Sequence, residues 1–307
     1  MGLAGRDLLT LADLSSAEVL EILELAAALK SGQTAVHCPK TLGLIFSKSS
    51  TRTRVSFSAA IMQMGGQVLD LNPNVTQVGR GEPIADTARV LSRYLDVLAI
   101  RTFAQQDLEE YAHYADIPVI NALTDDYHPC QILADLQTIQ ENFGQWQDLT
   151  LTYLGDGNNV AHSLLLGCAQ VGMNVRIACP PDYQPQERIV AKAREIAGDR
   201  AKVEILHDPI AASQGAHVLY TDVWASMGQE EEAQARVKAF TPYQLNQALL
   251  EKADPAAIVL HCLPAHREEE ITAEVLEGSQ SRVWDQAENR LHAQKAVLAL
   301  LLDTVQF

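Results

Sequence analysis

Residues 41–64 have the sequence TLGLIFSKSSTRTRVSFSAAIMQM, in which a β-rich run is followed by a polar loop and then by a helical pattern. We predict a strand at 41–47 and a helix at 55–64, because apolar side chains recur at helical spacing in the second segment. The same strand-then-helix order recurs along the rest of the chain. Such alternation is typical of a parallel sheet with crossover helices, so we predict an α/β fold.

The alternation predicts two sheets, because a polar stretch at 142–148 interrupts it before it starts again. The expected strands lie at 41–47, 67–71, 97–102 and 119–123, and then at 149–154, 175–178, 203–206, 217–221 and 258–260. We expect two doubly wound parallel-sheet domains, residues 1–147 and 148–307, with the active site in the cleft between them. The last helix, at about 292–305, is apolar enough that we expect it to pack back on the first domain.

The chain is acidic, with 39 Asp and Glu against 23 Lys and Arg and a formal net charge of -16. This charge repels polyanions, which argues against nucleic acid or an anionic membrane as a partner but allows a small anion at a local basic site. The cysteines number five and form no CxxC pair, which indicates free thiols in a reducing compartment. We expect a cytoplasmic protein, because the N-terminus lacks a secretory pattern and no apolar run approaches the ~20 residues that a bilayer requires.

A segment rich in cations and hydroxyls, KSSTRTR at 48–54, follows the first predicted strand and leads into a helix. Backbone amides at a helix N-terminus point outward, so these side chains are placed to bind a phosphate group. The Gly-rich Walker A pattern is absent from the sequence, and a nucleoside triphosphate is therefore not indicated. The alternative is a solvated basic loop with an ordinary helix cap.

Arg101 ends one predicted strand, and His128-Pro129-Cys130-Gln131 follows the next. Since parallel strands end at one edge of a sheet, Arg101 and His128 are expected to converge and to donate hydrogen bonds to a carbonyl oxygen. Gln131 offers both a donor and an acceptor. The alternative is that His128 is only structural.

Two loops of the second predicted domain carry amide and carboxylate groups. The sequence GDGNN at 155–159 resembles a dinucleotide fingerprint, but its third small residue would fall at Val160. Nicotinamide binding is thus the weaker interpretation, and the stronger is that Asn158 or Asn159 projects an amide at the cleft. In DVWASMG at 222–228, Asp222 is suited to hold an ammonium group, unless the segment is an ordinary loop.

A third loop, HCLPAHR at 261–267, combines a thiol with two imidazoles. Zinc binding and a cysteine nucleophile are both alternatives here, although a fourth zinc ligand at matching spacing is missing from the sequence.

Taken together, STRTR at 50–54, HPCQ at 128–131, DVWASMG at 222–228 and HCLP at 261–264 resemble the signature set of the ornithine carbamoyltransferases, within the aspartate/ornithine carbamoyltransferase family. The resemblance covers nearly the whole chain, from residue 48 to residue 292. It implies an enzyme that transfers the carbamoyl group of carbamoyl phosphate to the δ-amine of L-ornithine. The products would be citrulline and phosphate, in arginine biosynthesis, with neither a metal nor a cofactor.

The resemblance also implies roles for individual residues. Catalysis would involve Arg52, Arg101, His128 and Cys262. Carbamoyl phosphate would bind to Ser50, Thr51, Arg52, Thr53, Gln77, Arg101, His128, Gln131, Cys262, Leu263 and Arg290. Ornithine would bind to Asn159, Asp222, Ser226 and Met227. Gln77 matches a position that reaches into a neighbouring subunit, which implies a homotrimer with shared active sites. Two positions depart from the family: Glu268 stands where Gly is frequent, and Ser58 stands where Glu is frequent.

Other functions compatible with these motifs are a carbamoyltransferase for putrescine, N-acetylornithine or aspartate, a non-catalytic protein that binds carbamoyl phosphate, and a nicotinamide dehydrogenase. The Ser-Met-Gly segment favours ornithine as the acceptor. The sequence leaves open whether the reaction serves arginine synthesis or citrulline breakdown, and whether trimers assemble further.

Overall fold

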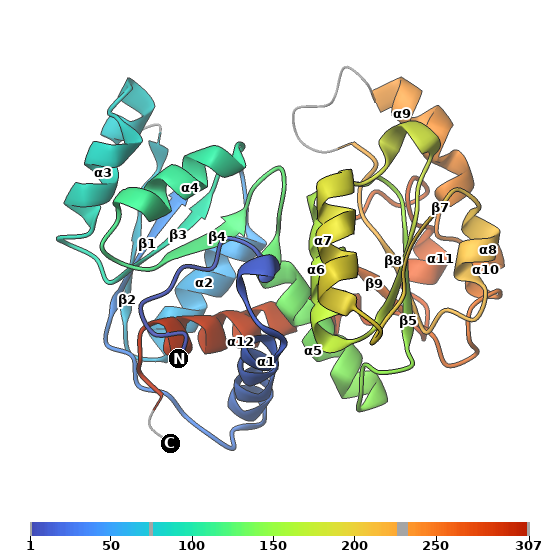
Figure 1. The fold of residues 1–307 in the computed structure, drawn as a ribbon, viewed down its shortest axis with the longest axis horizontal. Helices are drawn as coiled ribbons and strands as arrows, with labels where there is room; N and C mark the ends of the chain where they lie inside the picture. Colours follow the sequence, from blue (N-terminus) through green and yellow to red (C-terminus); the bar gives the residue numbers. More distant parts are fainter. Residues whose placement is uncertain (1, 74–75, 226–232, 306–307) are drawn as a thin grey trace. The chain divides into compact units, whose positions relative to one another are not determined.

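The computed structural model describes residues 2–73, 76–225 and 233–305. By its internal contacts the chain divides into two compact units, the first Met1–Gln137 with Glu288–Phe307 and the second Thr138–Ala287 (Figure 1). The division falls inside helix α5 (Pro129–Phe143), earlier than the boundary that the polar stretch at 142–148 suggests. Residues 288–307, with most of helix α12 (Val283–Leu301), belong to the first unit.

Within its described residues, the first unit holds a parallel four-stranded sheet in the order β2-β1-β3-β4. Its strands are β1 (Thr41–Phe46), β2 (Gln67–Asp70), β3 (Val97–Arg101) and β4 (Val119–Leu123). Its other helical segments are η1 (Leu11–Asp13), α1 (Ser16–Ser31), α2 (Arg52–Gln63), η3 (Gln77–Arg80), α3 (Ile84–Leu91) and α4 (Gln105–Tyr114). In Figure 1, α3 and α4 cover one face of this sheet and α1, α2 and α12 cover the other.

The second unit holds a parallel five-stranded sheet among its described residues, in the order β7-β6-β5-β8-β9. Its strands are β5 (Thr150–Leu154), β6 (Asn174–Ala178), β7 (Val203–Leu206), β8 (Val218–Thr221) and β9 (Ile258–His261). Its helical segments are α6 (Asn159–Val171), η4 (Pro181–Tyr183), α7 (Glu187–Ala197), α8 (Pro209–Ser213), α9 (Ala233–Phe240), η6 (Thr241–Tyr243), α10 (Gln247–Leu250) and α11 (Ala273–Leu276). Figure 1 shows α6 and α7 on one face and α8, α10 and α11 on the other.

Both sheets have the doubly wound parallel arrangement that the sequence predicts, and each expected strand is present. The strands could be predicted because a strand covered on both faces is apolar along its length and is easy to recognise in the sequence. In the central strand β5 every residue is buried, and helix α6, packed against the sheet, is buried from Val160 to Val171.

Two helices begin earlier than their sequences suggest. Helix α2 begins at Arg52 rather than at Val55, and α12 begins at Val283 rather than near His292. In both helices the extra turns contain polar residues, which hide the apolar periodicity. Arg52 and Thr53 therefore lie in the first turn of α2, and Arg290 lies within α12.

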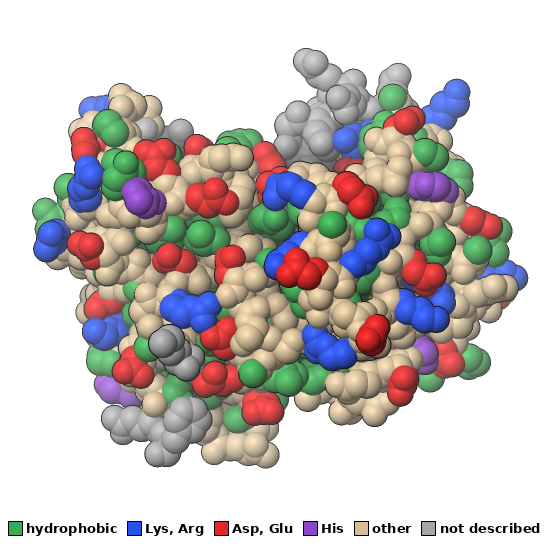
Figure 2. Space-filling model, viewed as in Figure 1, with side chains coloured by type: hydrophobic (Ala, Val, Ile, Leu, Met, Phe, Trp, Pro, Cys, Tyr) green, Lys and Arg blue, Asp and Glu red, His purple; other side chains and the backbone are tan. Residues whose placement is uncertain are grey.

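Among the described residues, helices sufficiently long and apolar to span a membrane are absent. On the described part of the face drawn in Figure 2, Lys and Arg side chains are interspersed with Asp and Glu.

Candidate active site

The predicted phosphate-binding segment follows β1 at the edge of the sheet where β3 also ends. Phe46 pairs with Arg101 in the ladder between these strands, and the Ser47 backbone N–H donates to the Arg101 carbonyl at 2.8 Å. Arg101 is half-buried, whereas Thr53, His128, Gln131 and Arg290 are buried. We call the following residues of the first unit the cationic set: Ser50, Thr51, Arg52, Thr53, Arg101, His128, Gln131 and Arg290.

Arg290 joins three elements of the first unit. Its Nη1 donates to Gln131 Oε1 and its Nη2 to Thr53 Oγ1, both at 2.6 Å. Gln131 Nε2 in turn donates to Asp135 Oδ1 at 2.8 Å, one turn further along α5. Because both of these partners are neutral, they orient the guanidinium without cancelling its charge. The Thr53 hydroxyl accepts from Arg290, which leaves its hydrogen available to a ligand.

His128 is a neutral imidazole in a strongly positive environment. Burial lowers its pKa well below the ordinary value of 6.5, and the guanidinium groups of Arg290, Arg101 and Arg52 lower it further. These charges therefore lie close enough to act on one buried ring. Such a convergence favours a small anion, and a neutral imidazole can donate one hydrogen bond to an uncharged carbonyl oxygen.

Lys48 and Arg54, the other cations of the segment, are held by carboxylates. Lys48 pairs with Asp125 and lies 4.3 Å from the centroid of the Phe103 ring. Arg54 pairs with Asp70 and lies 4.8 Å from the Phe46 centroid. These carboxylates offset the charges of Lys48 and Arg54.

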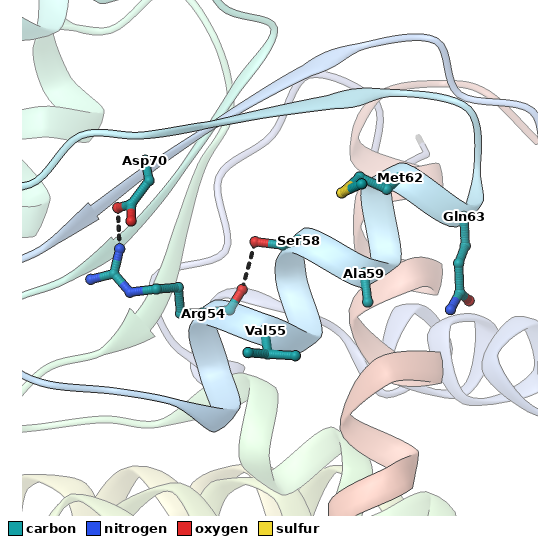
Figure 3. A pocket seen from close by; sticks show the side chains of 7 residues that line it. All are labelled: Arg54, Val55, Ser58, Ala59, Met62, Gln63 and Asp70. Carbon is teal, nitrogen blue, oxygen red and sulfur yellow. Dashed lines mark hydrogen bonds and ion pairs between the residues drawn. The ribbon is translucent and has the colours of Figure 1, made fainter.

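Ser58 stands near this Arg54–Asp70 pair (Figure 3). Its hydroxyl donates to the Arg54 carbonyl at 2.8 Å. The carboxylate partner of Arg54 thus comes from β2, and an acidic side chain at position 58 is not needed for it.

A second group of side chains surrounds Asp222 in the second unit. Asp222 Oδ1 accepts from the Cys262 thiol at 3.0 Å, and its Oδ2 accepts from Asn158 Nδ2 at 3.1 Å. Asn158 follows β5, Asp222 follows β8 and Cys262 follows β9, and these three strands are adjacent in the sheet. We call Asn158, Asp222 and Cys262 the carboxylate set. It is chemically suited to an ammonium or amine ligand.

The amide of Asn158, which contacts Asp222, is held by the cap of helix α6. Asn158 caps α6, where its Oδ1 accepts from the backbone N–H groups of Val160 at 3.0 Å and Ala161 at 3.2 Å. The cap fixes the amide so that its Nδ2 is directed to Asp222. Asn159 is the first residue of the helix, and its carbonyl accepts from Ser163 Oγ at 2.9 Å.

Gly157 allows the turn after β5 to fold this closely. A Cβ at this position would lie 2.2 Å from the backbone nitrogen of Pro185. Gly157 is therefore explained by packing against residues 184–185 and Gly155 by its φ of 145°, so a dinucleotide is not required to account for either glycine.

The loop after β9 is held by a buried pair, His261 and Glu270. The Leu263 N–H donates to His261 Nδ1 at 2.8 Å, so Nε2 carries the hydrogen and donates to Glu270 Oε1 at 3.0 Å. Leu263 has φ 58°, a left-handed conformation that costs a non-glycine residue about 1 kcal/mol. The histidine ring thus stabilises a strained turn beside Cys262.

These contacts weigh against the zinc and cysteine-nucleophile interpretations. Ligand atoms of Asp222, His261 and Cys262 lie within 4.8 Å of one another. However, both ring nitrogens of His261 and both oxygens of Asp222 already have hydrogen-bond partners. A carboxylate next to Cys262 also disfavours the thiolate that a nucleophile requires.

One pair in the second unit was not predicted from sequence. Arg236, on α9, forms a buried ion pair with Asp156, with Nη1 2.8 Å from Oδ2. The same Nη1 donates to the Trp224 carbonyl at 2.9 Å. Only the tertiary fold brings these residues together, so sequence spacing gave no signal for them.

The remaining predicted residues are placed as follows. Gln77 is exposed on η3, and Leu263 is half-buried beside Cys262. Ser226 and Met227 lie outside the described residues. Glu268 has φ 68°, which explains why glycine suits this position, and its Oε1 accepts from the Ala273 N–H at 2.9 Å at the start of α11.

Comparison with known proteins finds two family models that together match most of the chain. Residues 6–141 match the carbamoyl-P binding domain of aspartate/ornithine carbamoyltransferase, and residues 147–301 match its Asp/Orn binding domain. The chain is 97% identical over 305 residues to the ornithine carbamoyltransferase of Synechococcus elongatus, covering 99% of this chain and 100% of the relative.

Solved structures give the same similarity. The ornithine carbamoyltransferase from Pyrococcus furiosus is 50% identical, with a TM-score of 0.95 and coverage of 100% of both chains. The enzyme of that name from Gloeobacter violaceus is 59% identical, with a TM-score of 0.89 over 96% of this chain and 98% of that chain.

Proposed function

Since the chain belongs to the aspartate/ornithine carbamoyltransferase family, we propose that it transfers the carbamoyl group of carbamoyl phosphate to the δ-amine of L-ornithine. The products are L-citrulline and phosphate. The relatives named above support ornithine as the acceptor, and they do not favour putrescine or N-acetylornithine.

The proposal rests mainly on Arg290, whose guanidinium donates to Thr53 in the predicted phosphate segment and to Gln131, both at 2.6 Å, and whose charge helps to lower the pKa of buried His128. In this proposal Arg52, Ser50, Thr51 and Thr53 hold the phosphate end of carbamoyl phosphate. Arg101, His128 and Gln131 hold its carbamoyl end, and Arg290 and the Leu263 backbone complete the pocket.

The acceptor would bind at the carboxylate set. Asp222 carries a negative charge oriented by Asn158 and Cys262, and it is suited to hold an ammonium group. An ordinary carboxylate is too weak a base to deprotonate an alkyl amine, so Asp222 orients the acceptor rather than removing its proton. We assign Asn159, Ser226 and Met227 to ornithine as well, on the resemblance. That the two sets face each other across an interdomain cleft stays a prediction from sequence.

The chemistry must overcome the protonation of the acceptor. An alkyl amine with a pKa of ~10.4 is mostly protonated at neutral pH, and freeing its lone pair costs about 4 to 5 kcal/mol. Desolvation beside Cys262 lowers that cost. Arg101, His128 and the Thr53 hydroxyl would stabilise the oxyanion, each donor contributing about 3 kcal/mol. Arg52 neutralises the departing phosphate, and holding both substrates together adds ~7 kcal/mol.

We further propose a homotrimer in which Gln77 reaches into a neighbouring copy. Exposed Val55 and Met62 on α2, each 60% accessible, support an interface there. They line a pocket of about 630 Å³ with Asp70 (Figure 3). Sedimentation velocity of the chain alone would check the oligomeric state, and a monomeric mass would contradict the trimer.

The reaction is proposed to serve arginine biosynthesis in the cytoplasm. All five cysteines lie in the described residues and have reduced thiols, which suits a reducing compartment.

The test is a ureido-product assay with carbamoyl phosphate and a panel of ornithine, putrescine, N-acetylornithine and aspartate. We expect citrulline with ornithine, and much slower product formation with the others. Turnover that is fastest with another amine would overturn the assignment of the acceptor. Tight binding of carbamoyl phosphate without turnover would favour a binding protein.

A further inference from the structure

The carboxylate set depends on two neighbouring loops. Asn158 lies in the loop after β5, and Asp222 lies in the loop after β8. Their contact, 3.1 Å from Nδ2 to Oδ2, spans the two loops. A small change in loop spacing would break this contact and change the direction of the Asp222 carboxylate.

Arg236 binds both loops from a third element. Its Nη1 donates to Asp156 Oδ2 in the first loop at 2.8 Å and to the Trp224 carbonyl in the second at 2.9 Å. These three residues are buried, with exposed fractions of 6% for Arg236, 9% for Asp156 and 4% for Trp224. The guanidinium also lies 5.0 Å from the centroid of the Tyr183 ring.

Each contact of Arg236 falls two residues from a member of the carboxylate set. Asp156 precedes Asn158, and its carbonyl accepts from the Asn158 N–H at 2.7 Å. Trp224 follows Asp222 along the second loop. The guanidinium is therefore placed to fix the spacing of the two loops.

We propose that Arg236 is a positioning residue for the amine acceptor, because it ties together the two loops that bring Asn158 to Asp222. This inference rests on the proposed function. Removing Arg236 would leave the Asp156 carboxylate buried without its charged partner, and such groups draw in water or shift to regain hydrogen bonds. Burial raises the pKa of Asp156, and the Arg236 guanidinium opposes that rise. The loss of Arg236 would therefore disturb the loop that carries Asp156.

The test is steady-state kinetics of the full chain with both substrates varied, comparing wild type with Arg236→Met, which keeps the side-chain length. We expect the KM for ornithine to rise about tenfold or more, and the KM for carbamoyl phosphate to change less than about twofold. A purely structural role would lower kcat with the folded fraction and leave both KM values unchanged, and that result would overturn the proposal.

Three further variants keep the test decisive. Arg236→Lys retains the charge without the planar fork and should give an intermediate ornithine KM, and Asp156→Asn should raise it in the same direction. Asp156→Asn combined with Arg236→Met should be no worse than the more affected single variant, because both remove one contact. Additive effects would contradict the pairing. If Arg236→Met fails to fold, Arg236→Lys and Asp156→Asn decide the question alone.

The matched control is Arg176→Met in the same unit. Arg176 Nη1 donates to the carbonyls of Ala212 at 3.1 Å and Gln214 at 2.9 Å, away from the carboxylate set, and both KM values should stay within about twofold. If wild type itself forms no ureido product, the proposed function fails and this inference falls with it. If wild type turns over and the ornithine KM of Arg236→Met is unchanged, the inference alone fails.

Discussion

The charged side chains are arginines in the cationic set, whereas the carboxylate set has the single acidic side chain Asp222. In the first, Arg290 is oriented by the neutral groups of Thr53 and Gln131, which do not cancel its positive charge. In the second, one carboxylate is oriented by the amide of Asn158 and the thiol of Cys262. In both sets, neutral hydrogen-bond partners fix a charged side chain in place without cancelling the charge that a substrate needs.

Among the substitutions considered, the loss of Arg52 should have the largest effect. We expect Arg52→Ala to lower kcat/KM for carbamoyl phosphate about 10³-fold, because a phosphate oxygen loses its charged donor. Initial rates of citrulline formation measure this loss. Arg89→Ala is the control, since Arg89 lies on α3 in an exposed pair with Asp86 and should behave as wild type. Unchanged kinetics at Arg52 would contradict its assignment.

Substitution in the carboxylate set should affect the kinetics with ornithine rather than with carbamoyl phosphate. Asp222→Asn should raise the KM for ornithine about 100-fold while leaving that for carbamoyl phosphate nearly unchanged, because only the amine loses its ionic partner. The exposed residue Asp182 provides the control, as Asp182→Asn. An equal rise in both KM values would show that the two sets do not divide the substrates as proposed.

Cys262→Ser tests the role of the thiol alone, because the serine hydroxyl can still donate to Asp222. We expect the efficiency with ornithine to fall about tenfold or less, without complete loss. Intact-mass spectrometry during turnover should detect only unmodified protein. A trapped carbamoyl-cysteine adduct would instead make the thiol a nucleophile.

The lowered pKa of His128 should make the free energy of unfolding depend on pH. Below about pH 6.5 the unfolded chain binds a proton at this residue that the folded chain does not, because the folded pKa is well below 6.5. Stability should therefore decrease as pH falls below 6.5, by about 1.4 kcal/mol per unit until the folded pKa is reached.

Urea unfolding at pH 7.5 and 5.5 would measure this dependence. His128→Gln should lose less stability than wild type between these two pH values, whereas His113→Gln, at an exposed position on α4, should keep the wild-type dependence. The same dependence in wild type and His128→Gln would exclude His128 as its source.

The smallest effect is expected at Glu268, outside both sets. Glu268→Gly removes the left-handed strain and also the hydrogen bond to the Ala273 N–H, so the change in unfolding free energy should stay within about 1 kcal/mol. Glu268→Ala loses the hydrogen bond but keeps the strain, and it should be the less stable of the two. Thermal melts compare them, and equal stability would argue against this explanation.

The fold was predictable from the sequence because buried parallel strands are short apolar runs. The same pattern failed near polar residues of the site: half-buried Arg52 begins α2 and buried Arg290 lies within α12, although both surroundings look like loops. The candidate residues were found because they follow strands, and Asp222 and Cys262 do meet. Family resemblance assigns Asn159 to ornithine, which stays a prediction, and the contact of its neighbour Asn158 with Asp222 was not specified by the sequence, because it depends on how the helix cap fixes the amide.

The partners Glu270 and Arg236 were not predicted. Their roles come from contacts with His261 and Asp156, which depend on the tertiary packing of loops after different strands. Spacing along the chain carries no information about such pairs.

The tight approach at Gly157 limits how this enzyme could be re-engineered. A library that randomises the turn after β5 to accept a different amine must leave position 157 unvaried, because even a methyl group would lie 2.2 Å from Pro185 N. Diversity is better introduced at neighbouring positions whose side chains do not meet the backbone of another loop.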